Sequence, residues 1–175
     1  MTTRNSIPET HQKKLREIRA IFLDVDGVLT DGSIVYTSDG AELKAFHVQD
    51  GLGIRLAMEK GLRVGLITGR SSEVVERRAR ELGITDLYQG SLDKASVLDE
   101  IEAVYDLTDE QVAYMGDDIL DLPVLRRVGF SAAPANAHPA VLQAVDFVTQ
   151  KTGGNGAVRE MIDYILSARD GAAEV

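Results

Sequence analysis

Aspartates gather at two places in the chain, and each group follows an apolar run. The stretch FLDVDGVLTDG places Asp24 and Asp26 two residues apart, and the stretch GDDILD holds Asp117, Asp118 and Asp121. Carboxylates that converge repel one another, so keeping them ionised is costly unless a cation or a raised pKa intervenes. The chain has no cysteine, and its three histidines form no ligand pattern. Oxygen ligands of this kind favour Mg²⁺ over zinc.

The apolar runs before these aspartates are short and end in turn residues, as buried parallel strands do. We expect strands at residues 20–25, 63–68 and 112–115, with weaker candidates at 87–89, 129–132 and 146–149. Between them, apolar residues recur at helical spacing. The expected helices are residues 71–82, one that Lys94 opens, and a last one that includes residues 158–166. This alternation predicts an α/β fold, a doubly wound parallel sheet of the Rossmann-like kind.

One segment departs from the alternation. Residues 33–46 contain two extended runs, SIVYT and ELKAF, around Ser38-Asp39-Gly40, which predicts a β-hairpin insertion. The hairpin leaves no room for a separate cap domain. We therefore expect a single domain over residues 20–170, preceded by a lead-in at residues 1–19.

In an open α/β sheet, ligands bind beyond the carboxyl ends of the strands. Asp24, Thr68 and Asp117 come at or just after the ends of expected strands, and Lys94 opens the helix after a weaker one. A hydroxyl and an ammonium opposite a carboxylate-bound cation would suit a phosphoryl group. Taken alone, Thr68 could instead cap the following turn, and Lys94 could be a solvated helix residue.

Together these residues resemble the four ordered motifs of the haloacid dehalogenase superfamily: DxDGxxTDG, an apolar strand ending in Thr, a later Lys, and GDDxxD. The match spans about residues 20–121. The resemblance implies a phosphoric monoester hydrolase in which Asp24 attacks phosphorus and forms an aspartyl-phosphate. Asp26 would protonate the leaving oxygen and then deprotonate water. Positions i and i+2 of an extended strand face the same side, so both carboxylates could reach one substrate.

The same resemblance implies a magnesium site and a pair of phosphoryl-binding residues. Mg²⁺ would be held by Asp24, the backbone carbonyl of Asp26, and Asp117, and it would offset the repulsion between carboxylate and phosphate. Thr68 and Lys94 would bind the equatorial phosphoryl oxygens, whose charge must be stabilised in the transition state.

Further stretches, FHVQDGLGI, ITGR and TGGNGAVRE, resemble the family of 3-deoxy-D-manno-octulosonate 8-phosphate phosphatases, which make the lipopolysaccharide sugar Kdo. This resemblance covers nearly the whole chain after residue 19 and implies a capless homotetramer in which a neighbouring subunit covers the site. The residues that it assigns to the substrate are Asp26, His47, Val48, Gln49, Asp50, Gly51, Arg55, Arg70, Arg78 and Lys94. An arginine can bind the substrate's carboxylate through two hydrogen bonds.

The hairpin is too short to bury itself, so Ile34, Val35 and Tyr36 are candidates for the contact between subunits. Whether residues 171–175 reach a neighbour's site is left open by the sequence. Gly153, Gly154 and Gly156 could belong to an anion-accepting helix N-terminus, but we favour a structural or subunit-contact role.

Several assignments keep a structural alternative. Arg70 could pair with Glu73, and Arg78 could be a surface charge. His47 stands where the pattern of the family often has asparagine, and it could be a residue of the hairpin edge. Asp121, like Asp118, could hold the water shell of the metal or orient Lys94.

Composition limits the classes of function. A net charge of −9 and a pI near 4.8 argue against a nucleic-acid or anionic membrane surface, because both need clustered Lys and Arg. Residues 1–19 hold no apolar signal segment, and no apolar run approaches the roughly 20 residues that span a bilayer, so we expect a cytoplasmic protein. Three alternatives remain: a phosphatase for a nine-carbon keto-sugar acid phosphate, a non-catalytic phosphatase-like assembly module, and a response-regulator-like phosphoacceptor. Intact Asp24 and Asp26 disfavour the assembly module, and Asp26 disfavours the phosphoacceptor, because a receiver has no use for a proton donor to a leaving alcohol.

Overall fold

A central parallel sheet organises the molecule. The computed structural model describes residues 7–170, and within them six strands form one sheet in the order β5-β4-β1-β6-β7-β8, every neighbouring pair being parallel. These strands are β1 (Ala20–Leu23), β4 (Arg63–Ile67), β5 (Asp86–Tyr88), β6 (Val112–Met115), β7 (Phe130–Ala133) and β8 (Phe147–Val148). The predicted doubly wound sheet is confirmed, including the three strands with the weaker sequence patterns.

Helices cover both faces of this sheet. They are α1 (Glu9–Glu17), α2 (Val48–Glu59), α3 (Glu73–Leu82), α4 (Lys94–Tyr105), α5 (Leu122–Leu125), α6 (Pro139–Leu142) and α7 (Ala157–Asp170), with the 3₁₀ turns η1 (Asp109–Gln111) and η2 (Ile119–Asp121). Residues 9–17, part of the expected lead-in, form a helix whose Leu15 is buried in the core beside α7. None of the helices within residues 7–170 has the length and apolar character needed to cross a membrane.

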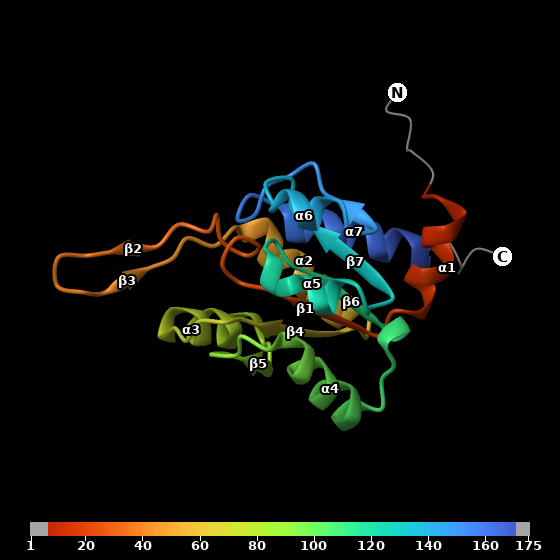
Figure 1. The fold of residues 1–175 in the computed structure, drawn as a ribbon, viewed down its shortest axis with the longest axis horizontal. Coiled ribbons are helices and arrows are strands. Elements are labelled where there is room, and N and C mark those ends of the chain that lie inside the picture. The colour runs from red at the N-terminus through yellow and green to blue at the C-terminus, as the bar shows by residue number, and fades with distance from the viewer. Residues whose placement is uncertain (1–6, 171–175) are drawn as a thin grey trace.

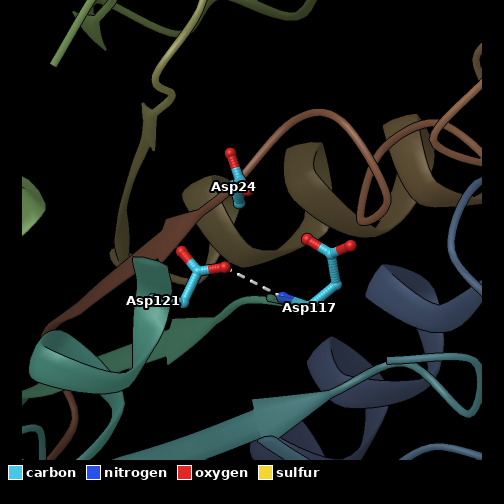
Figure 2. Close-up of side chains that lie close together, drawn as sticks. All are labelled: Asp24, Asp117 and Asp121. Atoms are coloured by element: carbon cyan, nitrogen blue, oxygen red, sulfur yellow. Dashed lines mark hydrogen bonds between the residues drawn. The ribbon is translucent and has the colours of Figure 1, made fainter. Parts of the chain in front are cut away.

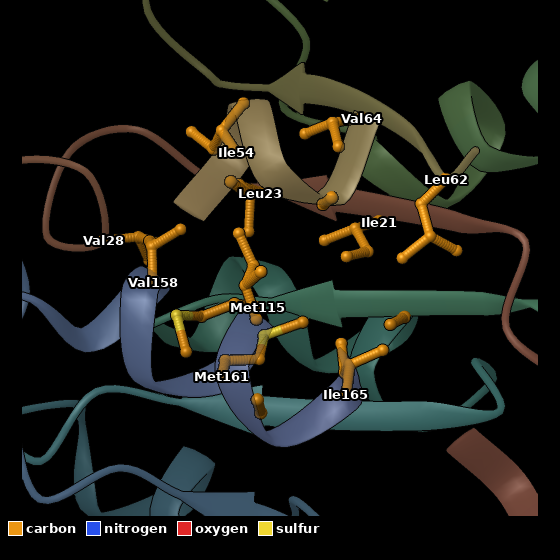
Figure 3. Packing of buried hydrophobic residues seen from close by; sticks show 14 of the residues in the cluster. Ile21, Leu23, Val28, Ile54, Leu62, Val64, Met115, Val158, Met161 and Ile165 are labelled. Atoms are coloured by element: carbon orange, nitrogen blue, oxygen red, sulfur yellow. The ribbon is translucent and has the colours of Figure 1, made fainter. Parts of the chain in front are cut away.

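Two hydrophobic cores hold the layers together. On one face, α1, α2, α3 and α7 pack on the sheet, and on the other face α4, α5 and α6 do so. Figure 3 shows the first core, where Ile21 and Leu23 of β1 lie with Met161 and Ile165 of α7. Fully burying an apolar side chain of this size stabilises a fold by roughly 1.5–3 kcal/mol, so the strands are fixed from both sides.

The strand order places the site at the centre of the sheet. The chain winds outward from β1 through β4 to β5, and then returns to β6 on the other side of β1. Leu23, the last residue of β1, pairs with Met115, the last residue of β6. Residues that follow these two ends therefore lie side by side, at the point where an open α/β sheet binds its ligands.

The predicted hairpin is confirmed as β2 (Val35–Tyr36) and β3 (Glu42–Leu43), an antiparallel pair that extends away from the body of the molecule (Figure 1). Its turn contains Gly40 at a φ of +89°, a left-handed conformation that favours glycine. Val35 and Leu43 face each other across the pair, and both are exposed. The hairpin thus presents apolar side chains that it cannot cover by itself.

Candidate active site

Asp24 follows β1 directly and is almost fully buried, with 8% of its surface exposed. Its Oδ1 accepts a hydrogen bond from the backbone N–H of Val25 at 2.7 Å, and its Oδ2 lies 3.0 Å from the Lys94 ammonium. Burial raises the pKa of Asp24 to about 6, although Lys94 acts in the opposite direction. A carboxylate in this position is poorly hydrated and fixed in orientation, as a nucleophile needs to be.

Lys94, at the start of α4, is held by a buried polar cluster. Its Nζ donates to Oδ1 of Asp121 at 2.7 Å and to the Tyr114 hydroxyl at 3.3 Å, and that hydroxyl donates to the same Asp121 oxygen at 2.6 Å. Burial by itself would lower the pKa of Lys94, but the charges of Asp24 and Asp121 outweigh it, and the pKa is raised. The ammonium therefore stays protonated next to Asp24.

The alternative in which Asp121 orients Lys94 has direct contacts in its favour. The second oxygen of Asp121 accepts hydrogen bonds from the backbone N–H groups of Asp117 and Asp118, at 3.0 and 3.1 Å. Both of its oxygens are thus occupied, and the residue is fully buried. Asp118, by contrast, is exposed, and its side chain accepts a hydrogen bond from the N–H of Ile119 at the start of η2.

Asp24, Asp117 and Asp121 form a candidate cation site. Each offers a carboxylate oxygen, and these atoms lie within 4.8 Å of one another; Figure 2 shows the three side chains around one space. Burial, and then the charge of Asp24, raise the pKa of Asp117 to about 7. Since Asp121 is committed to other partners, Asp24 and Asp117 fit best as direct ligands of a hard divalent cation.

Thr68 lies at the carboxyl end of β4 and is buried. Its hydroxyl oxygen accepts a hydrogen bond from the backbone N–H of Arg70 at 3.4 Å, which is the turn-capping role left open by the sequence. Its backbone N–H donates to the carbonyl of Tyr88 in β5, at 2.9 Å. The capping contact leaves the hydroxyl proton available for a phosphoryl oxygen.

Asp26 is more exposed than Asp24 and makes different contacts. Its carboxylate forms an ion pair with Lys44, which follows β3, and the other carboxylate oxygen lies 3.9 Å from Nε of Arg70. Arg70 does not take Glu73 as its partner; its Nη2 donates to Oε1 of Glu42 at 2.7 Å. The base of the hairpin thus reaches the site, a contact between distant segments that the sequence pattern does not reveal.

Asp50, an expected substrate residue, uses its carboxylate in a contact inside the protein. It is 1% exposed, and its carboxylate accepts hydrogen bonds from the N–H groups of Gly156 and Arg159, at 3.3 and 2.8 Å. Both donors lie at the start of α7, where a carboxylate satisfies backbone groups that have no helical partner. This capping role turns the side chain inward, and the expected substrate contact of Asp50 stays a prediction.

The remaining expected substrate residues surround the first half of α2. Arg55 and Arg78 line an open groove of about 330 Å³ between α2 and α3, together with Val48 and Gly51. A Cβ on Gly51 would lie 2.4 Å from Nη2 of Arg78, so a side chain there would displace the end of this arginine. The aspartate cluster does not line this groove.

His47 and Gln49 stand beside the loop that precedes α7, because both approach within 4 Å of the Cβ position of Gly156. His47 occupies the N-cap position of α2 without a capping hydrogen bond. Its Nδ1 is buried and has no hydrogen-bond partner within residues 7–170. Buried polar atoms without a partner are uncommon in folded proteins, so this ring nitrogen is an unusual feature of the loop.

The loop before α7 is structural. A Cβ on Gly153 would lie 1.8 Å from the carbonyl oxygen of Gly27, and the N–H of Gly154 donates to the carbonyl of Val28 at 2.9 Å. The loop therefore packs on the backbone that follows Asp26, which agrees with the structural role favoured for these glycines.

Three residues of the site escaped sequence reasoning. Tyr114 was interpreted only as an apolar strand residue, although a tyrosine hydroxyl buried before GDD requires a partner. Lys44 and Glu42 were assigned only to the hairpin. The pattern of extended residues that predicts the hairpin does not indicate that these side chains point toward Asp26.

Known proteins are similar to this chain in both sequence and fold. A family model of haloacid dehalogenase-like hydrolases matches residues 80–162. The 3-deoxy-D-manno-octulosonate 8-phosphate phosphatase of Escherichia coli strain K12 is 47% identical over 156 residues, which cover 89% of this chain and 83% of that protein. The chain belongs to this family of haloacid dehalogenase-like phosphatases.

Solved structures agree with the assignment to the phosphatase family. The crystal structure of the phosphatase from Yersinia pestis has a TM-score of 0.91 and 46% identity, covering 95% of this chain and 90% of its own. The enzyme from Moraxella catarrhalis, solved in complex with magnesium ion, phosphate ion and a KDO molecule, has a TM-score of 0.89 and 43% identity, covering 91% and 92% of the two chains.

Proposed function

We propose that this chain is a Mg²⁺-dependent phosphatase that hydrolyses 3-deoxy-D-manno-octulosonate 8-phosphate to Kdo and inorganic phosphate, in the synthesis of lipopolysaccharide precursors. One observation carries the chemistry: the buried Asp24 carboxylate is ion-paired with Lys94 and lies close to the carboxylate of Asp117. The relatives named above support the substrate. We place the enzyme in the cytoplasm.

In the first step, an oxygen of Asp24 attacks phosphorus, and the bond between phosphorus and the sugar oxygen breaks. Asp26 gives its proton to that oxygen, and an aspartyl-phosphate remains. Asp26 then takes a proton from water, which attacks the aspartyl-phosphate and releases inorganic phosphate. Lys94 and Thr68 bind the phosphoryl oxygens while negative charge builds up on them.

Mg²⁺ fits the oxygens of Asp24 and Asp117, with the backbone carbonyl of Asp26 as the third expected ligand, and when bound it screens the charge between carboxylate and phosphate. Lys94 cannot move far, because Asp121 and Tyr114 hold its ammonium. The site is therefore organised before substrate arrives, which lowers the free energy of the transition state.

The sugar part of the substrate remains assigned to His47, Val48, Gln49, Asp50, Gly51, Arg55, Arg70 and Arg78. The carboxylate of Asp50 caps α7, so we assign its contact with the sugar to the backbone. We also propose a homotetramer in which the exposed apolar hairpin meets a neighbouring subunit and helps to cover the site. Residues 171–175 lie outside the described residues.

A substrate panel tests the proposal. Phosphate release is measured with 3-deoxy-D-manno-octulosonate 8-phosphate, a nine-carbon keto-sugar acid phosphate and ordinary hexose phosphates, with Mg²⁺ and with a chelator. We expect the eight-carbon substrate to have the highest kcat/KM, and the chelator to abolish turnover. A higher kcat/KM for the nine-carbon substrate would favour that alternative, and no release from any of them would favour a non-catalytic assembly module.

A further inference from the structure

Lys44 is the most deeply buried cation at the base of the hairpin. Only 1% of its side chain is exposed, and its ammonium forms an ion pair with the carboxylate of Asp26. A second carboxylate, that of Glu42, lies 3.6 Å from the same Nζ. Burying an ammonium costs free energy unless the charge is paired. As long as the hairpin stays in this position, Lys44 therefore remains paired with Asp26 and Glu42.

The two oxygens of Asp26 have different surroundings. One is held by Lys44, while the other lies 3.9 Å from Nε of Arg70, beyond hydrogen-bond distance. The first oxygen is thus anchored by Lys44, and the second accepts no hydrogen bond from Arg70. Asp26 is also the more accessible of the two reactive aspartates, with 21% of its side chain exposed against 11% for Asp24.

Further contacts keep Lys44 in place. Glu42 accepts a hydrogen bond from Arg70 at 2.7 Å, and its other oxygen accepts one from the hydroxyl of Ser72, at the start of α3. Tyr36 of β2 contacts Arg70 as well, with 3.4 Å between its hydroxyl and Nη2. This network ties the hairpin to the loop after β4 and leaves the Lys44 ammonium little freedom beside Asp26.

We infer that Lys44 is a positioning residue for proton transfer: it anchors one oxygen of Asp26 so that the other oxygen faces the departing alcohol. The inference rests on the proposed phosphatase activity. In the step concerned, the bond between phosphorus and the sugar oxygen breaks, the bond between Asp24 and phosphorus forms, and the Asp26 proton moves to the sugar oxygen. Lys44 itself exchanges no proton and touches no reacting atom.

The competing explanation is that Lys44 only stabilises the hairpin. The two explanations differ in how the rate depends on the leaving group. A primary sugar alcohol needs a proton as it departs, whereas p-nitrophenolate is a stable anion and leaves without one. Because kcat/KM reports the reaction up to the first irreversible step, the ratio of kcat/KM for the two substrates measures the help given by Asp26 in that step.

The experiment compares Lys44→Met with the unchanged protein on the sugar phosphate and on p-nitrophenyl phosphate, both with Mg²⁺. We expect kcat/KM for the sugar phosphate to fall by about 10- to 100-fold, a part of the 10²- to 10⁴-fold that general acid catalysis supplies. For p-nitrophenyl phosphate we expect a fall of no more than about threefold. Equal losses on the two substrates, or no loss on either, would overturn the inference.

A double-mutant cycle shows whether Lys44 acts through Asp26. In an Asp26→Asn protein, adding Lys44→Met should leave the ratio of the two kcat/KM values unchanged, because no proton remains to be positioned. A further change in the ratio contradicts the inference. Lys14→Met is the matched control: it makes the same change at a lysine of α1 that pairs with Asp146 outside the aspartate cluster, so the ratio should stay that of the unchanged protein.

If Lys44→Met does not fold, as judged by circular dichroism, Lys44→Gln replaces it with the same expected and contradicting results. The activity of the unchanged protein distinguishes a failure of the proposed function from a failure of the role of Lys44. No turnover of either substrate by that protein would contradict the proposed function. Normal turnover with an unaltered ratio in the Lys44 variants would contradict only the role of Lys44.

Discussion

Among single residues, Asp121 explains how a lysine can be buried beside the nucleophile. Its carboxylate accepts from Lys94 and Tyr114 on one oxygen, and from two backbone N–H groups on the other. Removing one member of a buried charge pair leaves the other uncompensated, which typically costs about 3–5 kcal/mol. Asp121 thus fixes the ammonium and joins β6 to α4.

The pKa values of the aspartates lead to a pH dependence of metal binding. In the metal-free protein the pKa is raised from 3.8 to about 6 for Asp24 and to about 7 for Asp117, in both cases mainly by burial. Between pH 3.8 and about 7, the folded protein therefore binds more protons than the unfolded one. Its free energy of unfolding falls as the pH rises through this range. Mg²⁺ competes with these protons, and its affinity should therefore rise with pH.

Calorimetric titration with Mg²⁺ at about pH 5.5 and about pH 8 measures this effect, and the use of two buffers gives the number of protons released. We expect tighter binding and fewer released protons at the higher pH. Equal affinity at both pH values would show that the two carboxylates are not the ligands.

Among the elements, the loop before α7 supports the loop that follows β1. Gly153 touches the backbone of Gly27, the residue next to Asp26, so closely that no side chain fits between them. After this loop, Asp50 of α2 caps the start of α7 and so holds α7 next to α2. The backbone around the reactive aspartates is therefore positioned by elements more than 100 residues away in the sequence.

Gly153→Ala tests this support. Its new Cβ would lie 1.8 Å from the carbonyl oxygen of Gly27, so the loop must move, and we expect a loss of about 1–3 kcal/mol in the free energy of unfolding. Turnover should fall as well, because Asp26 moves with the loop. Urea unfolding and phosphate release measure the two effects.

The matched control is Gly61→Ala, in the turn between α2 and β4, where a Cβ meets no atom within 4 Å. The backbone there has a φ of +81°, so this variant should lose some stability through strain yet keep its turnover. Unchanged stability and turnover in Gly153→Ala would refute the supporting role of the loop.

The sequence predicted the elements whose pattern is strong and missed α1, α2, α5 and α6. The strands and helices α3, α4 and α7 follow from apolar periodicity and turn residues. Helix α2 did not stand out, because Gly51 and Gly53 have a low helix propensity. Both glycines are buried against neighbouring side chains, including Arg78 and Arg159, and this tertiary packing outweighs the propensity.

For the site, the motifs located the reactive aspartates, Thr68 and Lys94, because each stands at the end of a strand or the start of a helix. Asp121 as the partner of Lys94 was one of two alternatives that the sequence left open, and the other partners could not be predicted. Lys44 reaches Asp26 from the hairpin, and Asp50 turns toward α7, and both outcomes depend on how segments fold back on one another. Motif matching finds residue types at set positions but gives no side-chain direction.

At the scale of the whole molecule, the hairpin is the element whose apolar side chains a single chain does not cover. Ile34, Val35, Tyr36 and Leu43 are all about half exposed or more, on a two-stranded ribbon that is too small to be stable by itself. Its base, however, carries Lys44 and Glu42 to the site. An assembly that covers the hairpin would therefore also steady the residues around Asp26.

Val35→Asp should reduce the size of the assembly, because an aspartate buried in an apolar contact costs several kcal/mol unless it is paired. Light scattering measures the mass in solution. Val104→Asp, the same change at an exposed position of α4, is the control and should keep the mass of the unchanged protein. A Val35→Asp protein with the mass of the unchanged assembly would contradict the proposed contact.

The central claim is that Asp24 is the nucleophile of a phosphatase. The most direct measurement is the rate of phosphate release from 3-deoxy-D-manno-octulosonate 8-phosphate by the Asp24→Asn protein, with Mg²⁺ present and thermal unfolding recorded to show that the variant is folded. Losing the nucleophile should reduce turnover by at least about 10³-fold. A folded Asp24→Asn protein that released phosphate at a rate close to that of the unchanged protein would contradict the account.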